Sequence, residues 1–257
     1  MDNGWEVRKI GPLNYLVMPA FESVLHGVTT KEIGEFNSDN PEKIKTRLNE
    51  LFGINQIAWT TQLHGDEIYV IGENNFNQFV EENLPEQVQP FNSVNPNSGN
   101  ELIEADGLMT NIPGICLTIR IADCLPIFIL DKKNKAIGLV HAGWRGTVKC
   151  IVQKAILKMI TLYGSSPEDF IVGFGPSIGV CCYKVGNDVT ELIKDKDLVK
   201  DGYLNLQKVN KKQLLELGIN NIILNQYCTY DERDLFFSHR RGDKGRMIAF
   251  LQMGVME

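Results

Sequence analysis

The chain has 257 residues, of which 43% are hydrophobic and 23% are charged, enough to bury the core of a single domain spanning residues 1–257. Its formal net charge of −6 disfavours a nucleic-acid-binding surface, which needs a basic excess. No run approaches the roughly 20 apolar residues of a membrane-spanning helix, and no signal peptide is evident, so we expect a cytoplasmic protein without a membrane partner.

The first predicted helix begins at Pro41 and ends before Gly53. Proline is favoured in the first turn of a helix, and glycine is favoured just after the last one. Ile44 and Leu48 fall on one face, which we expect to be buried. The polar, asparagine-rich stretch from 73 to 104 has little periodicity, so it is predicted to be a long loop.

Short apolar runs separated by turn residues predict buried strands. These runs are Ile57–Trp59, Ile115–Ile119, Pro126–Leu130, Ala136–Val140, Ile171–Phe174, Ile222–Leu224 and Arg246–Leu251. Helical periodicity predicts helices over Thr147–Tyr163, Asn187–Ile193 and Asn205–Leu217. Because strands and helices follow each other without a regular βαβ rhythm, we predict an α/β (α+β) fold with a mixed β-sheet core flanked by helices.

Three candidate metal ligands, His64, Cys124 and His141, each lie at the end of an apolar run with glycines nearby. Two imidazoles and a thiol on a rigid sheet would suit a metal ion such as zinc. The spacing alone leaves open that the histidines are hydrogen-bonded structural residues and that the cysteine is a small core residue. Dispersed ligands lack the strong Cys-x-x-Cys signature of a zinc site.

A series of short motifs in the chain resembles the laccase-domain family, also called YfiH-like or polyphenol oxidoreductase. The motifs are Thr61–Gly65 (TQLHG), Glu104–Thr110 (EADGLMT), Ala122–Pro126 (ADCLP), His141–Gly146 (HAGWRG), Gly175–Ile178 (GPSI), Cys181–Tyr183 (CCY) and Phe236–Arg241 (FFSHRR). The resemblance runs from about His26 to Phe250. It implies a YfiH-like fold and a zinc ion held by His64, Cys124 and His141 with a fourth position open.

The same resemblance implies an activity, because members of this family are described as zinc-dependent purine nucleoside phosphorylases. The expected substrates are phosphate and the nucleosides adenosine, inosine, guanosine and 5′-methylthioadenosine, which would be cleaved to the free base and ribose 1-phosphate. An accompanying adenosine deaminase activity is also implied. A zinc ion with an open position suits both reactions, since it lowers the pKa of bound water to about 7. The protein would be a monomer or a homodimer.

Phosphorolysis requires groups that hold phosphate, and guanidinium groups match its geometry. The candidates are Arg145, Arg240, Arg241 and Arg246. For each the alternative is a solvated or ion-paired surface side chain. Arg145 is also a candidate catalytic residue. Asp106 and Asp123 both adjoin the strand runs. Of the two, Asp123 is preferred as an acid or base, or as the residue that orients a metal-bound histidine.

Two other enzyme classes fit the same residues. Two histidines and one cysteine also suit a mononuclear blue-copper centre, so copper is possible and a polyphenol oxidase (laccase) is the first alternative. A multicopper cluster, however, needs more imidazoles than the four histidines of this chain. The second alternative is a metal-free hydrolase with Cys124 as the nucleophile and His141 or His64 as its base. Cys181, Cys182 and Cys228 are interpreted as packing residues, with a thiol cluster as the other possibility.

Overall fold

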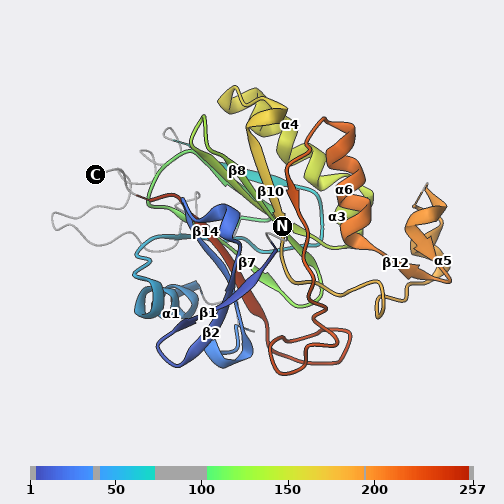
Figure 1. The fold of residues 1–257 in the computed structure, drawn as a ribbon, viewed down its shortest axis with the longest axis horizontal. Helices are drawn as coiled ribbons and strands as arrows, with labels where there is room; N and C mark the ends of the chain where they lie inside the picture. Colours follow the sequence, from blue (N-terminus) through green and yellow to red (C-terminus); the bar gives the residue numbers. More distant parts are fainter. Residues whose placement is uncertain (1–3, 37–40, 73–102, 194, 255–257) are drawn as a thin grey trace.

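Two six-stranded β-sheets form the centre of the protein in a computed structural model that describes residues 4–36, 41–72, 103–193 and 195–254 (Figure 1). The strands of the first sheet, in spatial order, are β1 (Glu6–Ile10), β2 (Leu13–Val17), β3 (Leu25–Thr29), β14 (Met247–Gln252), β7 (Cys116–Ile121) and β4 (Ile57–Ala58). Those of the second are β13 (Ile222–Ile223), β10 (Phe170–Phe174), β8 (Leu125–Asp131), β9 (Ala136–Ala142), β6 (Gly107–Thr110) and β5 (Ile68–Ile71).

Both sheets combine parallel and antiparallel pairs. The parallel pairs are β4 with β7, β5 with β6, and β10 with β13. The long central pairs, β14 with β7 and β8 with β9, are antiparallel. The prediction of a mixed β-sheet core is therefore confirmed.

The two sheets pack face to face over a shared hydrophobic core. Leu117 and Ile119 of β7 belong to the same buried cluster as Phe128 and Leu130 of β8. Because side chains alternate between the faces of a strand, the intervening Ile129 of β8 lies on the other face, in a second cluster. Both faces of β8 and β9 are thus covered, which is why these strands are continuous apolar runs.

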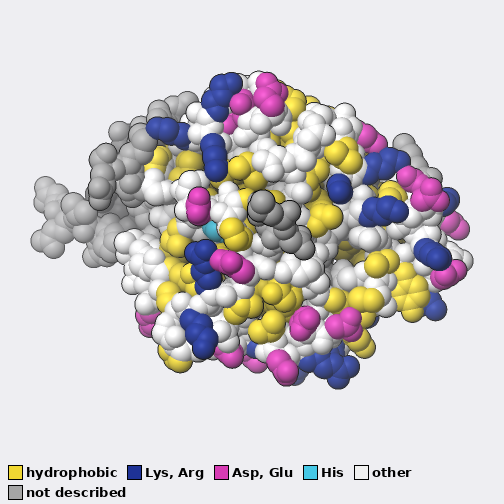
Figure 2. All heavy atoms as spheres, viewed as in Figure 1, with side chains coloured by type: hydrophobic (Ala, Val, Ile, Leu, Met, Phe, Trp, Pro, Cys, Tyr) yellow, Lys and Arg dark blue, Asp and Glu magenta, His cyan; other side chains and the backbone are white. Residues whose placement is uncertain are grey.

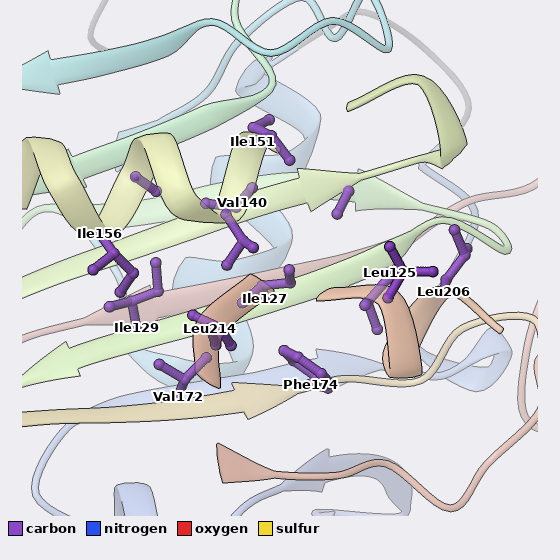
Figure 3. Close-up of a cluster of buried hydrophobic side chains, with 14 of the residues drawn as sticks. Leu125, Ile127, Ile129, Val140, Ile151, Ile156, Val172, Phe174, Leu206 and Leu214 are labelled. Carbon is purple, nitrogen blue, oxygen red and sulfur yellow. The ribbon is translucent and has the colours of Figure 1, made fainter. Parts of the chain in front are cut away.

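Helices cover the outer face of each sheet. Against the second sheet lie α3 (Trp144–Val148), α4 (Ile151–Tyr163) and α6 (Leu206–Glu216), and their apolar side chains meet those of β8, β9 and β10 (Figure 3). The first sheet is covered by α1 (Pro41–Phe52), whose Ile44 and Leu48 pack with Phe250 of β14. Beyond α6 lie α5 (Asn187–Thr190) and a ribbon of β11 (Val199–Lys200) and β12 (Tyr203–Leu204). Helices flanking a sheet core are therefore confirmed.

Several element boundaries differ from the sequence-based prediction. The helix predicted over Thr147–Tyr163 is two helices, α3 and α4, because Cys150 between them adopts a left-handed conformation with φ of 59°. The helix predicted at Asn187–Ile193 ends at Thr190. The strands that were not predicted are β1, β2, β3, β5, β6, β11 and β12. The predicted loop over 73–104 lies outside the described residues except for its last two positions.

The surface carries both signs of charge. On the face shown in Figure 2, basic and acidic side chains are interspersed with apolar ones. None of the helices in the described part of the chain combines the length and the apolar character that crossing a membrane requires.

Candidate metal centre

The structure brings His64, Cys124 and His141 together. One ring nitrogen of each histidine and the Cys124 Sγ all lie within 4.8 Å of one another. The rings of His64 and His141 are 5.0 Å apart and nearly perpendicular, at 80°. These side chains come from three separate segments, so their convergence is a property of the fold and not of local sequence.

The pairing of β8 and β9 explains the position of two of these residues. Pro126 of β8 faces His141 of β9 across the antiparallel ladder, and Cys124 directly precedes β8. Cys124 and His141 therefore lie at the same end of the second sheet. His64 lies in the segment that connects β4 of the first sheet to β5 of the second. Its ring contacts that of His141, so it lies at the same end of the second sheet.

A buried carboxylate, Asp106, holds the two histidines in place. Its Oδ1 accepts a hydrogen bond from Nδ1 of His141 at 2.8 Å and another from the backbone N–H of His64 at 3.0 Å. Its Oδ2 accepts from the backbone N–H groups of Leu63 at 3.2 Å and Gly65 at 2.6 Å. Because Asp106 occupies Nδ1 of His141, the other ring nitrogen is left for the side of Cys124. This arrangement is common in histidines that bind metals.

The role expected for Asp123 as the partner of a metal-binding histidine therefore belongs to Asp106. The carboxylate of Asp123 is instead bonded to loop residues: Oδ1 accepts from Thr229 Oγ1 at 2.7 Å, and Oδ2 accepts from Ser238 Oγ at 3.0 Å and from the backbone N–H of Arg240 at 2.7 Å. With three donors already on its two oxygens, Asp123 fastens the C-terminal loops to the site.

The backbone at the site is locally strained. His64 and Asp123 both have positive φ values, 59° and 86°, a region that side chains other than glycine rarely adopt. The start of α3 crowds the site from the other side, because a Cβ on Gly143 would lie 3.2 Å from the Cys124 Sγ, and one on Gly146 would lie 2.7 Å from the Gly65 carbonyl oxygen. These close approaches explain why glycine occupies both positions in the HAGWRG motif.

Cys124, His141 and Asp106 influence one another's protonation at the site. Burial raises the pKa of a thiol, but the imidazoles of His141 and His64 outweigh it and lower the pKa of Cys124 to about 6. Burial opposes a charge on His141 too, yet the Cys124 thiolate and the Asp106 carboxylate raise the pKa of His141 to about 9. Asp106 has a lowered pKa despite its burial, mainly because of its contact with His141.

A cavity of about 630 Å³ opens directly onto these side chains. Among the described residues that line it, five are Lys or Arg and one, Asp123, is a carboxylate. The cationic ones are Arg120, Arg145, Arg240, Lys244 and Arg246. A positive cavity in a chain with a net charge of −6 concentrates anions at the site. Its volume lies within the range of about 300–1,000 Å³ that is usual for small-molecule sites.

Three of the four arginines predicted to bind phosphate line this cavity. The Arg145 guanidinium lies 4.3 Å from the Trp144 ring, and the Arg240 guanidinium lies 5.1 Å from the Tyr183 ring. Arg246 lines the cavity while its Nη1 donates to the carbonyls of Asp243, Lys244 and Gly245.

Arg241 is the exception among the four. Its guanidinium donates to Asp243 and to the carbonyls of Thr229, Tyr230 and Phe236, and it is not among the residues that line the cavity. The structure therefore places Arg241 within the loop scaffold. Gln62, Tyr183 and His239, which sequence reasoning did not single out as functional, do line the cavity.

The donor set fits a zinc ion. Two imidazole nitrogens and one thiolate sulfur are common zinc ligands, and three protein ligands leave the fourth tetrahedral position for water or substrate. All three residues line the cavity, so the cavity gives access to the group that they form. Because the lowered pKa of Cys124 favours the thiolate, little free energy is needed to deprotonate this ligand near neutral pH.

Known proteins resemble this chain over nearly its whole length. The profile of a family described as multi-copper polyphenol oxidoreductase laccase matches residues 21–254. A purine nucleoside phosphorylase of Bacteroides thetaiotaomicron is 30% identical, over 92% of this chain and 94% of the relative. The purine nucleoside phosphorylase YlmD of Geobacillus stearothermophilus is 30% identical over 91% of each chain. A crystal structure of the hypothetical protein YfiH of Bacillus licheniformis has a TM-score of 0.78 at 27% identity, over 96% of this chain and 98% of that one. The YfiH-like fold is thus confirmed.

The pKa of Cys124 predicts a specific reactivity. After treatment with a chelator, alkylation of Cys124 by iodoacetamide should reach half of its maximal rate near pH 6, since the thiolate is present above the pKa of about 6 and is lost below it. For an ordinary thiol the alkylation rate reaches half of its maximum at about pH 8.5. Mass spectrometry of the peptide that contains Cys124 measures the rate. A midpoint near that of an ordinary thiol would contradict the proposed influence of His141 and His64.

Proposed function

This chain belongs to the family described as multi-copper polyphenol oxidoreductase laccase, and we propose that within it the protein is a zinc-dependent purine nucleoside phosphorylase with an accompanying adenosine deaminase activity. The observation that carries the proposal is the cationic cavity that contains two imidazoles and a thiol. Relatives named purine nucleoside phosphorylase at 30% identity support the same activity. The substrates are phosphate and the nucleosides adenosine, inosine, guanosine and 5′-methylthioadenosine.

The distribution of the four histidines supports zinc over a multicopper centre. His26 is buried away from the cavity, where its Nε2 accepts from the backbone N–H of Met18 at 2.8 Å and its Nδ1 contacts the carbonyl of Val24 at 3.0 Å. His239 lies on the cavity wall but outside the group of converging ligand atoms. Two imidazoles and one thiolate therefore remain for a metal ion, too few for the several copper ions of an oxidase cluster.

Phosphorolysis at this site would use the cationic residues to bind phosphate beside the ribose. An oxygen of phosphate bonds to the glycosidic carbon of ribose, the glycosidic bond breaks, and the purine leaves with the electron pair and takes up a proton. Arg145 and Arg240 would hold the phosphate. This role is supported by their position in the cavity lining and by the strength of charge-assisted hydrogen bonds to phosphate. In the described part of the chain Arg145 forms no ion pair that would compete.

The remaining cavity residues suit the nucleoside. Trp144 and Tyr183 offer aromatic surface for a purine ring. His239 on the same wall is the candidate for donating the proton to the leaving base, and Asp123 acts as a positioning residue through its bonds to Thr229 and Ser238. Zinc, when bound by His64, Cys124 and His141, would supply a Lewis acid at the cavity floor.

The activity itself can be measured directly. Inosine and phosphate incubated with the protein should yield hypoxanthine and ribose 1-phosphate in equal amounts, and Cys124→Ser should abolish the reaction. Conversion of adenosine to inosine without phosphate measures the deaminase activity separately. Oxidation of phenols by the copper-loaded protein, with no nucleoside cleavage, would instead support the polyphenol oxidase. Turnover of an acyl or amide substrate that survives chelators would support the Cys124 hydrolase.

Replacing Arg145 should weaken phosphate binding. A hydrogen bond to a charged group contributes about 1.5–3 kcal/mol, so Arg145→Gln should raise the KM for phosphate by about 10-fold to 150-fold. The KM for the nucleoside should change much less. Arg8→Gln is the matched control, because Arg8 is exposed and paired with Glu6 on β1. An unchanged KM for phosphate in Arg145→Gln would remove Arg145 from the proposed phosphate site.

Replacing Asp106 should weaken the metal site without removing a ligand. Asp106→Asn keeps the shape of the side chain but loses the negative charge that His141 and residues 63–65 share. Loss of such a partner lowers metal affinity by about 10-fold to 100-fold, which zinc competition with a chromogenic chelator measures. Asp131→Asn is the matched control, since Asp131 is a buried carboxylate that bonds Asn134 in a distant turn. Equal affinities of both variants would refute the role of Asp106.

A further inference from the structure

Three cysteines and one aspartate form a second cluster outside the cavity. Cys181 and Cys182 lie in the turn after β10, and Cys228 and Asp231 lie in the segment after β13. Their three sulfur atoms and one carboxylate oxygen all lie within 4.8 Å of one another. Of the two interpretations of these cysteines, packing residues or a thiol cluster, the structure supports the cluster, which with Asp231 forms a compact group of four potential metal ligands.

Four distances within this cluster lie close to the edges of a tetrahedron around a metal ion. Cys181 Sγ lies 3.6 Å from Cys228 Sγ and 3.3 Å from Cys182 Sγ. Asp231 Oδ2 lies 3.2 Å from Cys181 Sγ, and Asp231 Oδ1 lies 3.2 Å from Cys182 Sγ. Around a zinc ion with Zn–S bonds of about 2.3 Å, two sulfurs are about 3.8 Å apart and a sulfur and an oxygen about 3.5 Å apart. The remaining pairs of ligand atoms lie within 4.8 Å of one another, so local side-chain shifts would seat an ion.

Backbone groups around the cluster support such a role. The N–H of Gly179 donates to Cys228 Sγ at 3.2 Å, which holds this sulfur in the cluster. A Cβ on Gly179 would lie 2.9 Å from Cys181 Sγ, so glycine is required for this approach. Cys228 and Asp231 are spaced as the two ligands of a short zinc-binding turn, and the turn is closed by a 3.2 Å bond from the Asp231 N–H to the Cys228 carbonyl.

We infer that Cys181, Cys182, Cys228 and Asp231 bind a second zinc ion in a closed, structural site. Three thiolates and a carboxylate complete a tetrahedron and leave no position for substrate. Soft thiolate ligands select zinc over magnesium or calcium. This site is independent of the proposed phosphorylase activity, because none of its four residues lines the cavity in the described part of the chain.

The position of the second site indicates what the ion would do. Tyr183, next to Cys182, lines the cavity beneath Arg240. Thr229, next to Cys228, donates to Asp123 at 2.7 Å. An ion shared by the two turns would thus link two walls of the cavity, much as a disulfide links two loops, while remaining compatible with a reducing compartment.

Metal content tests the inference. Protein saturated with zinc under reducing conditions and then desalted should contain about two zinc ions per chain by mass spectrometry of the metal. Cys124→Ser and Cys228→Ser should each contain about one, and the double variant none. Cys150→Ser is the matched control and should keep both ions, because Cys150 is a half-buried thiol that belongs to neither cluster.

Cobalt spectroscopy separates the two sites without relying on the Cys228 variant. In Cys124→Ser, cobalt should still give the intense thiolate charge-transfer bands of a site with three sulfurs, and Asp231→Asn in that background should weaken cobalt binding. One zinc ion in the wild type, none in Cys124→Ser and no thiolate bands in its cobalt form would overturn the inference. So would a disulfide between Cys181 and Cys228 that persists under the reducing conditions used for loading. Either result leaves the test of nucleoside cleavage unaffected.

Discussion

The carboxylate of Asp106 is the constraint on which the candidate metal centre depends. A buried carboxylate is costly unless its oxygens are fully bonded, and Asp106 meets this requirement with four donors from two segments of the chain. Three of them are backbone N–H groups of residues 63–65, and the fourth is the ring of His141. The same interaction that offsets the cost of burial therefore fixes the loop of one histidine and the ring of the other. His64 and His141 are therefore held in fixed positions because both segments donate hydrogen bonds to the buried carboxylate of Asp106.

The crossings between the two sheets explain why the site lies where it does. The segment with His64 connects β4 of the first sheet to β5 of the second, and Ala122–Cys124 connects β7 of the first sheet to β8 of the second. Each crossing needs a sharp change of direction, which the positive φ values of His64 and Asp123 provide. Strain of this kind persists only where surrounding contacts hold it. Here the sheets and the bonds to Asp106 and Asp123 hold it.

The sequence predicts the centre of the fold better than its edges. The runs in β7, β8 and β9 are continuous because both faces are buried, whereas β1 has four exposed residues among its five and carries no such pattern. The break between α3 and α4 at Cys150 was not predicted, because no glycine or proline occurs there in the sequence. The candidate metal ligands were predicted from motifs at strand ends and from the family resemblance, and of the two aspartates beside the strand runs, Asp123 was preferred to Asp106 as the partner of a ligand. Only the pairing of β6 with β9 brings Asp106 to His141.

The arginines show how the same residue type acquires different roles from its surroundings. Arg241 and Arg240 are neighbours in the chain, yet the Arg241 guanidinium is enclosed by three carbonyls and Asp243, while Arg240 donates to one carbonyl and lies over Tyr183 in the cavity. A guanidinium whose donors are already used has little left for an anion. Arg145 lies at the other extreme, held over Trp144 without an ion pair in the described part of the chain. The number of guanidinium groups that the cavity offers to an anion therefore depends on which donors the loop scaffold leaves free, and not on the number of arginines in the motif.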